Sequence, residues 1–195
     1  MSSKQAILQV AADCFSERGY RETSMSEVAK LVGVADGTIF YNFRSKEALF
    51  LAVLEEFRDS IRLALDDFLA ASRFATGLEM VEGLVCFYIN LADDMSDRFL
   101  LLHRYDSYKI ARSNPSFHAH LEAIYNCIVD AFENAIVRGQ QDGSIVEVPP
   151  RKQAFILFAS VDGLVRLKTF NLYQAETLYN ELIGSCRRML ARGDS

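Results

Sequence analysis

The chain has 195 residues, of which 50% are apolar and 24% are charged, a composition that supports a buried core and excludes a disordered tail. No apolar run approaches the ~20 residues that a membrane-spanning helix requires, and Met1 leads directly into an amphipathic pattern without the apolar segment of a secretory signal. The net charge is −5, yet residues 1–50 carry six basic and six acidic side chains. We therefore expect a cytoplasmic protein with no membrane partner, whose acidity belongs to residues 51–195.

The first part of the chain predicts helices separated by short turns. Apolar residues spaced three and four apart mark the first helix, which stops before Gly19. Ser24 and Glu27 have the spacing of a capping box that begins a second helix, Gly33 permits a tight turn, and Ser45 caps a long helix. The four helices are expected over 3–18, 25–32, 36–43 and 46–71.

The rest of the chain continues the helical periodicity, with no convincing strand or repeat. Proline occurs only at 115, 149 and 150, where it opens helices and does not break them. We therefore predict an all-α fold of about nine helices, with a three-helix head over 1–50 and a helical body over 51–195. The body helices are expected over 75–93, 97–112, 115–141, 150–169 and 172–191.

Two short helices joined by a glycine turn form a helix-turn-helix pattern. Its helices cross closely, so a small residue is needed at the crossing, and Ala29 provides it four residues before Gly33. An ordinary helical hairpin without a DNA role is the alternative. In the helix-turn-helix interpretation, the second helix presents to DNA the side chains of Asp36, Thr38, Tyr41 and Asn42.

One pattern runs almost continuously through residues 5–50: Ile7-Leu8, Ala11-Ala12, Phe15, Gly19-Tyr20, Thr23-Ser24-Met25, Val28-Ala29, Gly33-Val34 and Gly37 to Leu49. This pattern resembles the TetR family of bacterial transcriptional regulators in more than twenty positions. The rest of the chain matches only the general architecture of that family. The resemblance implies a homodimeric regulator, usually a repressor, that binds a near-palindromic double-stranded operator and is released by an effector bound in the body.

In that family the second short helix enters the major groove of DNA. The resemblance implies that Thr38, Tyr41 and Asn42 face the bases there and that Lys46 touches a phosphate. The complete set of DNA-binding residues that we expect is Thr23, Ser24, Ser26, Ala35, Asp36, Gly37, Thr38, Tyr41, Asn42, Arg44 and Lys46.

The chain departs from the family pattern at three positions in or next to the expected recognition helix. The family usually has Ser at Ala35, where it caps the recognition helix, and the loss of a cap typically costs ~1 kcal/mol. Asp36 is expected to offset part of this cost through the helix dipole. The family often has Tyr at Phe40 and an aromatic residue at Asn42, so neither position predicts an operator sequence.

Aromatic residues suggest an effector pocket in the body. The chain has 14 Phe and 8 Tyr, and most lie after residue 50, which suits an elongated apolar pocket for a small hydrophobic or amphipathic molecule. A polar and aromatic cluster over 103–108 either contributes to this pocket or forms hydrogen bonds between helices. The expected lining residues are Phe87, Leu91, Phe99, Leu102, His103, Tyr105, Tyr125 and Phe158.

The last two predicted helices are rich in apolar residues on broad faces. The family resemblance implies that they form the dimer interface, and an intramolecular core is the alternative; both interpretations are compatible. The predicted dimerisation residues are Phe155, Val161, Val165, Leu178, Leu182 and Cys186.

No pattern in the chain indicates catalysis or a cofactor. His118 and His120 are two residues apart and do not share a helix face, so no metal site is expected. The four cysteines are widely spaced within apolar helical patterns and are predicted to be buried, reduced thiols. We therefore expect no enzyme. The alternative to an effector-controlled regulator is a DNA-bound adaptor that recruits a protein partner without a small effector.

Overall fold

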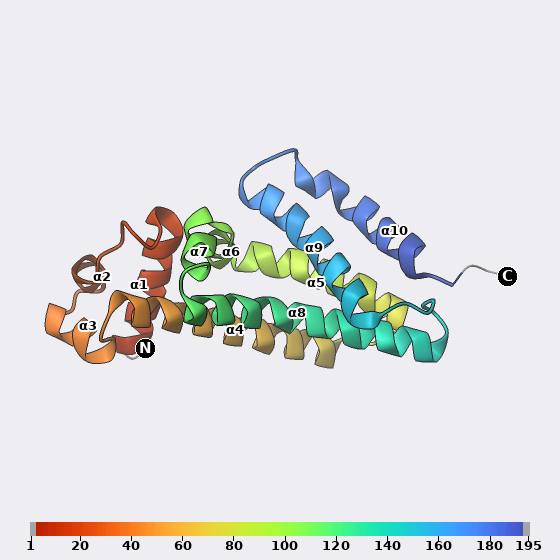
Figure 1. Ribbon diagram of the computed structural model, residues 1–195, viewed down its shortest axis with the longest axis horizontal. Coiled ribbons are helices and arrows are strands. Elements are labelled where there is room, and N and C mark those ends of the chain that lie inside the picture. The colour runs from red at the N-terminus through yellow and green to blue at the C-terminus, as the bar shows by residue number, and fades with distance from the viewer. Residues whose placement is uncertain (1–2, 193–195) are drawn as a thin grey trace. The chain divides into compact units, whose positions relative to one another are not determined.

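The computed structural model describes residues 3–192 (Figure 1). These residues contain ten α-helices and one short 3-10 helix, Ala175–Leu178, which confirms the all-α class. The outer ends of the predicted head and body, residues 1–2 and 193–195, lie outside the described residues. The α-helices are α1 Ser3–Arg18, α2 Met25–Val32, α3 Asp36–Asn42, α4 Lys46–Ala71, α5 Gly77–Asp94, α6 Ser96–His103, α7 Tyr105–Ala111, α8 Pro115–Asp142, α9 Pro150–Thr169 and α10 Tyr179–Leu190.

Two predicted helices differ from those observed. The helix expected over 97–112 is divided into α6 and α7, because Arg104 between them has an extended backbone with φ −64° and ψ 141°. The helix expected over 172–191 begins only at Tyr179. It is preceded by the 3-10 helix and by three residues with positive φ, which are Asn171, Tyr173 and Gln174.

The chain divides into two compact units, each made of two stretches. Among the described residues, unit 1 contains 3–60 and 95–124, and unit 2 contains 61–94 and 125–192. The chain passes from one unit to the other within α4, between α5 and α6, and within α8. The predicted end of the head at residue 50 therefore lies inside α4, and unit 1 combines the head with α6, α7 and the first part of α8.

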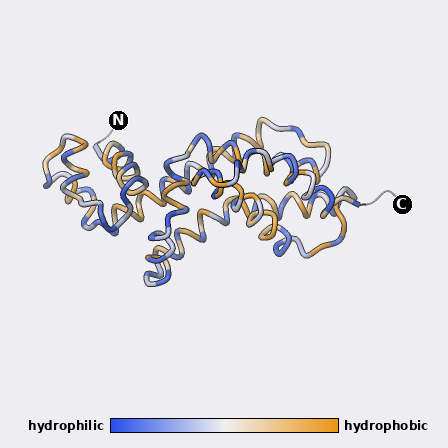
Figure 2. Tube along the Cα trace, turned by 90° about the horizontal axis from the view of Figure 1, so that it is seen from above, coloured by the Kyte–Doolittle hydropathy of each residue, from blue (hydrophilic) through white to orange (hydrophobic). Residues whose placement is uncertain are grey.

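An aromatic cluster holds unit 1 together. The Phe50 ring of α4 lies 4.9 Å from the Phe15 ring of α1, 5.1 Å from the Tyr20 ring and 5.0 Å from the Phe117 ring of α8. Such aromatic pairs contribute about 0.5–1.5 kcal/mol each beyond the area that they bury. Ile39 of α3 is fully buried as well. Hydrophobic positions recur between hydrophilic ones along the helices, as Figure 2 shows, so the predicted amphipathic patterns correspond to buried faces.

Unit 2 buries a second set of aromatic residues. The Phe68 ring of α4 stacks on the Phe87 ring of α5 at 4.8 Å. The Phe158 ring of α9 lies 5.7 Å from the Tyr88 ring of α5 and 5.2 Å from the Tyr125 ring of α8. In the described part of the chain, no helix combines the length and the apolar character needed to cross a membrane.

Candidate functional site

The first helix of the helix-turn-helix, α2, begins with a capped amide. Ser24 has an extended backbone (φ −109°, ψ 152°), and its hydroxyl accepts a hydrogen bond from the Glu27 amide at 3.2 Å. The Glu27 carboxylate, which we expected to reach back to Ser24, instead pairs with Arg18 at the end of α1. One half of the predicted capping box therefore forms, and the other half becomes a contact between helices.

The turn of the helix-turn-helix depends on Gly33. This residue adopts the left-handed conformation (φ 80°, ψ 29°), and its amide donates to the carbonyls of Ala29 and Lys30 at 3.0 and 3.2 Å. A side chain at Gly33 would meet no heavy atom within 4 Å, so the backbone conformation, and not space, favours glycine here. Ala29 is fully buried, as a close helix crossing requires.

The recognition helix α3 begins without a side-chain cap. Ala35 is the cap residue, with φ −66° and ψ 147°, and it makes no side-chain hydrogen bond. This confirms the predicted position of the missing cap. The Asp36 carboxylate accepts a hydrogen bond from the Ser26 hydroxyl at 2.7 Å, so the first turns of α2 and α3 are joined through their side chains. Asp36 also lies in the first turn of α3, where the helix dipole favours a negative charge.

The outer face of α3 is open. Tyr41 is 89% exposed and Phe40 is 49% exposed, whereas Ile39 is fully buried and anchors the helix. Thr38 and Asn42 are half-buried, and the Asn42 side-chain amide donates to the Thr38 carbonyl at 2.8 Å. The sequence interpretation treated Phe40 only as a departure from the family. Its exposure indicates that the ring lies at least partly on the outer face of α3.

The first turn of α3 also leaves its backbone uncovered. Gly37 is exposed, and a Cβ atom built there would meet no heavy atom within 4 Å. Ala35 and Asp36 before it are exposed, and so is Arg44 after the helix. This surface therefore offers backbone and a cation beside the Tyr41 side chain.

Thr23 has a different position from the one predicted. It is 1% exposed, and its hydroxyl lies 3.1 Å from the Cys14 carbonyl and 2.9 Å from the Gly19 carbonyl, with which it forms hydrogen bonds. This corrects the expectation for Thr23, because a hydroxyl directed into the interior cannot reach a phosphate. The nearby Ser24 and Ser26 remain exposed.

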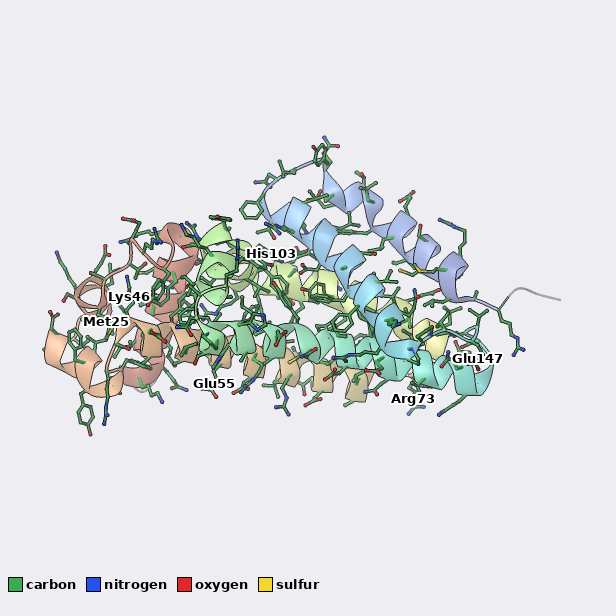
Figure 3. The ribbon with its side chains drawn as sticks, in the orientation of Figure 1. Met25, Lys46, Glu55, Arg73, His103 and Glu147 are labelled. Carbon is green, nitrogen blue, oxygen red and sulfur yellow. The ribbon has the colours of Figure 1, made fainter. Side chains whose placement is uncertain are left out.

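Lys46, at the start of α4, contacts the segment between α1 and α2 that contains Thr23 (Figure 3). Its ammonium donates to the carbonyls of Arg21 and Thr23 at 3.2 and 3.1 Å and lies 4.6 Å from the centre of the Tyr20 ring. The side chain is partly exposed. Lys46 therefore has a structural role that the sequence interpretation did not include.

The eight predicted effector-binding residues divide evenly between the units. In unit 2, the Tyr125 and Phe158 rings meet at 5.2 Å, and the sequence interpretation missed Tyr88, whose ring also contacts Phe158 and whose hydroxyl donates to the Asp162 carboxylate at 2.6 Å. Unit 2 contains Phe87, Leu91, Tyr125 and Phe158, and unit 1 contains Phe99, Leu102, His103 and Tyr105.

The unit 1 members of this set have different environments. Phe99, Leu102 and His103 are 1% exposed, and the Phe99 and His103 rings lie 6.0 Å apart. Tyr105 is 75% exposed. Of the two interpretations left open for the cluster over 103–108, hydrogen bonding between helices describes Arg104, which donates to carbonyls of α1.

The predicted dimerisation residues also differ in exposure. Val161, Val165 and Cys186 are at most 1% exposed and belong to the core of unit 2, as the alternative interpretation had it, whereas Phe155 and Leu178 are 47% and 40% exposed. Leu182 is half-buried. The exposed face of α9 carries further residues that the sequence interpretation did not include in the set, which are Ile156, Ala159 and Gly163.

The two histidines of α8 contact residues of their own helix. The His118 Nδ1 atom lies 3.5 Å from a Glu122 carboxylate oxygen, and the His120 Nδ1 atom lies 2.8 Å from the Ser116 carbonyl. Within residues 3–192, no group of three or more His, Cys, Asp or Glu side chains is arranged to hold a metal ion.

The cysteines are less uniformly buried than predicted. Cys14 and Cys186 are buried, and burial raises the pKa of the Cys186 thiol to about 11. Cys86 is exposed and Cys127 is half-buried, which corrects the prediction for these two. Both lie on helices whose apolar pattern does not distinguish the edge of the buried face from its centre.

Comparisons with known proteins agree with this geometry. The family model described as bacterial regulatory proteins of the tetR family matches residues 7–53, which contain α1 to α3 and the start of α4. The HTH-type transcriptional regulator RutR of Escherichia coli (strain K12) is 25% identical over 198 residues, which cover 98% of this chain and 90% of RutR.

Two solved structures have the same fold over nearly the whole chain. A transcriptional regulator from Saccharomonospora viridis in complex with choline has a TM-score of 0.82 and 21% identity, covering 97% of this chain and 98% of that one. The regulator FadR from Bacillus subtilis in complex with stearoyl-CoA has a TM-score of 0.78 and 22% identity, covering 95% and 98%.

Proposed function

Because this chain belongs to the TetR family of DNA-binding transcriptional regulators, we propose that it is a repressor that binds a near-palindromic operator as a homodimer. A small hydrophobic or amphipathic effector releases it. The observation that carries the proposal is the open face of α3, where Tyr41 is 89% exposed and Gly37 leaves its backbone uncovered. This exposed side chain lies on the second helix of the helix-turn-helix, the helix that enters the major groove in motifs of this kind.

In the proposed complex, α3 lies in the major groove. Tyr41, Thr38 and Asn42 face base edges, and the uncovered backbone at Gly37 permits close approach. Ser24, Ser26, Arg44 and Lys46 lie around α3 and contact phosphates, which fix the register of the protein on DNA. Thr23 contributes through its support of the turn and not through its hydroxyl.

The first experiment isolates operator sequences from a random DNA pool with the wild-type protein and then measures their affinity for Tyr41→Ala. Tyr173→Ala is the matched control, because Tyr173 is 81% exposed but lies in unit 2. We expect Tyr41→Ala to weaken binding and Tyr173→Ala to leave it unchanged, with both melting temperatures near the wild-type value. Equal binding by all three proteins would remove Tyr41 from the interface.

Dimerisation is proposed through the exposed face of α9 together with α10. Phe155, Ile156 and Met189 are 47%, 51% and 41% exposed, and a Cβ atom at Gly163 would meet no heavy atom within 4 Å. A large apolar face with a small residue within it allows a second helix to approach closely. Two heads in one dimer read two half-sites, which supplies the specificity that one short recognition helix lacks.

The effector is proposed to bind in unit 2 among the predicted aromatic residues Phe87, Tyr125 and Phe158. Two similar regulators were crystallised with choline and with stearoyl-CoA, so proteins of this fold hold ligands of very different size. The aromatic residues of this chain favour a hydrophobic or amphipathic ligand. A ligand releases DNA only if it prefers the conformation that does not bind the operator. Coupling of this kind is typically ~1–3 kcal/mol, or about 5- to 150-fold in operator affinity.

Reciprocity provides the test of this part of the proposal. Choline and acyl-CoA thioesters are titrated into the protein with and without saturating operator DNA. An effector must bind more weakly to the DNA complex by the same factor by which it weakens operator binding. A compound that binds equally in both titrations is not an inducer, and operator binding unaffected by every amphipathic compound would favour the adaptor without an effector.

A further inference from the structure

Arg104, the residue between α6 and α7, forms hydrogen bonds with the C-terminal end of α1. The Arg104 guanidinium donates from Nη1 to the carbonyl oxygens of Ser16 and Glu17 at 3.0 and 3.2 Å. Its Nε atom donates to Oδ1 of Asp106 at 3.1 Å. The last carbonyls of a helix have no partner within the helix, and a cation there is favoured by the helix dipole. Arg104 thus satisfies the C-terminal end of α1 from a segment almost ninety positions further along the chain.

Asp106 contacts the residues that directly follow α1. Its Oδ2 atom accepts a hydrogen bond from the Tyr20 backbone amide at 2.9 Å. Gly19 has φ +89°, and a Cβ atom there would lie 2.4 Å from Oδ2 of Asp106 and 2.9 Å from Nη2 of Arg104. A Cβ atom at Gly19 would therefore displace the ends of these two side chains, and the positive φ favours glycine as well. We call Arg104 and Asp106 together the α1 clamp.

The turn held by the clamp leads directly into the helix-turn-helix. Residues 19–23 connect α1 to Ser24, the cap of α2. Lys46 holds the same segment by donating to two of its carbonyls, and Tyr20 within it packs on Phe50 at 5.1 Å. The segment is thus tied at one end by the clamp and at the other by Lys46. α1 also contacts α2 and α3, so its position bears on the placement of both.

We infer that Arg104 and Asp106 are positioning residues for operator binding, which hold the turn before α2 so that α2 and α3 are preorganised for DNA, while neither side chain touches DNA. This inference rests on the proposed function, because it concerns the affinity for an operator. It adds residues from outside the helix-turn-helix sequence to the determinants of that affinity. The clamp belongs to α6 and α7, so these helices act on the head by direct contact within unit 1.

The test compares Arg104→Ala, Asp106→Ala and Asp106→Asn for operator affinity, its salt dependence and amide hydrogen exchange at Tyr20. We expect the two alanine variants to weaken operator binding by about 5- to 150-fold, the usual range for coupling between sites. Asp106→Asn keeps an oxygen that accepts from the Tyr20 amide and should lose less. Exchange at Tyr20 should accelerate in Asp106→Ala, because that variant removes the acceptor.

Salt dependence separates positioning from phosphate contact. Losing a phosphate contact lowers the slope of log affinity against log salt concentration by about one unit. Arg104→Ala should keep the wild-type slope while its affinity falls. Arg138→Ala is the matched control, because Arg138 also donates to a backbone carbonyl, that of Phe74 at 2.6 Å, but lies in unit 2. It should bind the operator like the wild type.

The outcomes distinguish this inference from the proposed function. If the wild type binds its operator and both alanine variants bind equally well, the clamp does not position the head, and the proposed function stands. A slope reduced by about one unit in Arg104→Ala would make Arg104 a phosphate contact and overturn the inference. If the wild type selects no DNA, the proposed function fails, and Tyr20 exchange still tests the clamp. Should Arg104→Ala not fold, Arg104→Lys replaces it, since one ammonium cannot reproduce the fork of the guanidinium.

Discussion

Unit 1 and unit 2 both consist of helices around buried aromatic residues, but their exposed helices differ in chemistry. The recognition helix α3 of unit 1 is anchored by Ile39 and presents Tyr41, Thr38 and an uncovered glycine. The α9 helix of unit 2 buries five residues of its own and exposes Phe155 and Ile156. The short helix α3 has one buried residue and presents polar groups, which suits binding to a polyanion such as DNA. The long helix α9 has five buried residues and exposes apolar side chains, which suits contact with a protein surface.

The largest predicted effect separates the core of α9 from its surface. Val161→Asp places a charge at a position that is fully buried, and an uncompensated buried charge costs about 3–5 kcal/mol. Phe155→Asp on the same helix should cost no more than the ~2 kcal/mol expected from a weakened dimer, because Phe155 is 47% exposed in the single chain. Urea unfolding of both variants measures the difference. Equal losses would show that α9 has no such division between buried and exposed faces.

The next prediction concerns self-association. Phe155→Asp and Ile156→Asp should each weaken the dimer by about 2 kcal/mol, or roughly 30-fold in the dissociation constant, if these side chains are central to its interface. Sedimentation equilibrium measures this change. Val137→Asp is the control, because Val137 is 37% exposed on α8 of unit 2. Wild-type association by both α9 variants would place the interface elsewhere.

Lys46 should contribute to stability and to DNA binding at the same time. Lys46→Met keeps the aliphatic stem over Tyr20 but removes two hydrogen bonds and the ammonium. We expect a loss of about 1–2 kcal/mol in unfolding free energy, since each such contact contributes roughly 0.5–1 kcal/mol. The salt slope of operator binding should also fall by about one unit. A lower melting temperature with an unchanged slope would leave Lys46 a purely structural role.

A smaller gain is expected from restoring the missing cap. Ala35 has the extended backbone of a cap residue, so the hydroxyl in Ala35→Ser can accept from an amide of the first turn of α3. The usual gain is ~0.5–2 kcal/mol. Because α3 has few anchors, operator affinity should rise as well. Thermal unfolding and operator titration provide the measurements, and Ser24→Ala, which removes the existing cap of α2, should change stability in the opposite direction.

The smallest predicted effect on stability should be accompanied by a change of operator affinity in the opposite direction. Gly37→Ala should stabilise α3 by roughly 0.5 kcal/mol, because alanine favours helix and the added Cβ meets nothing within 4 Å. Operator affinity should nevertheless fall, since the same methyl group would lie between α3 and DNA. Tighter DNA binding together with higher stability would show that Gly37 does not face the operator.

Much of the head was predictable because its signals are local. The bounds of α1, α2 and α4 agree with the predicted helices, and Ser24 and Gly33 act as the cap and the turn residue that their positions indicated. The uncapped start of α3 at Ala35 was implied by the resemblance to the TetR family. Each of these features depends on residues within about four positions, a span over which side-chain spacing and backbone preference decide the conformation.

The sequence by itself therefore determined most of the helices, the helix-turn-helix and its resemblance to the TetR family, whereas the tertiary structure decided which side chains are available. Periodicity runs through Arg104, yet the helix breaks there and the Arg104 side chain donates to carbonyls of α1. Thr23 resembles an exposed hydroxyl until its partners Cys14 and Gly19 are known. The Asp106 carboxylate meets the Tyr20 amide across 86 positions. Contacts at such separations leave no trace in local spacing, because they depend on how whole helices pack.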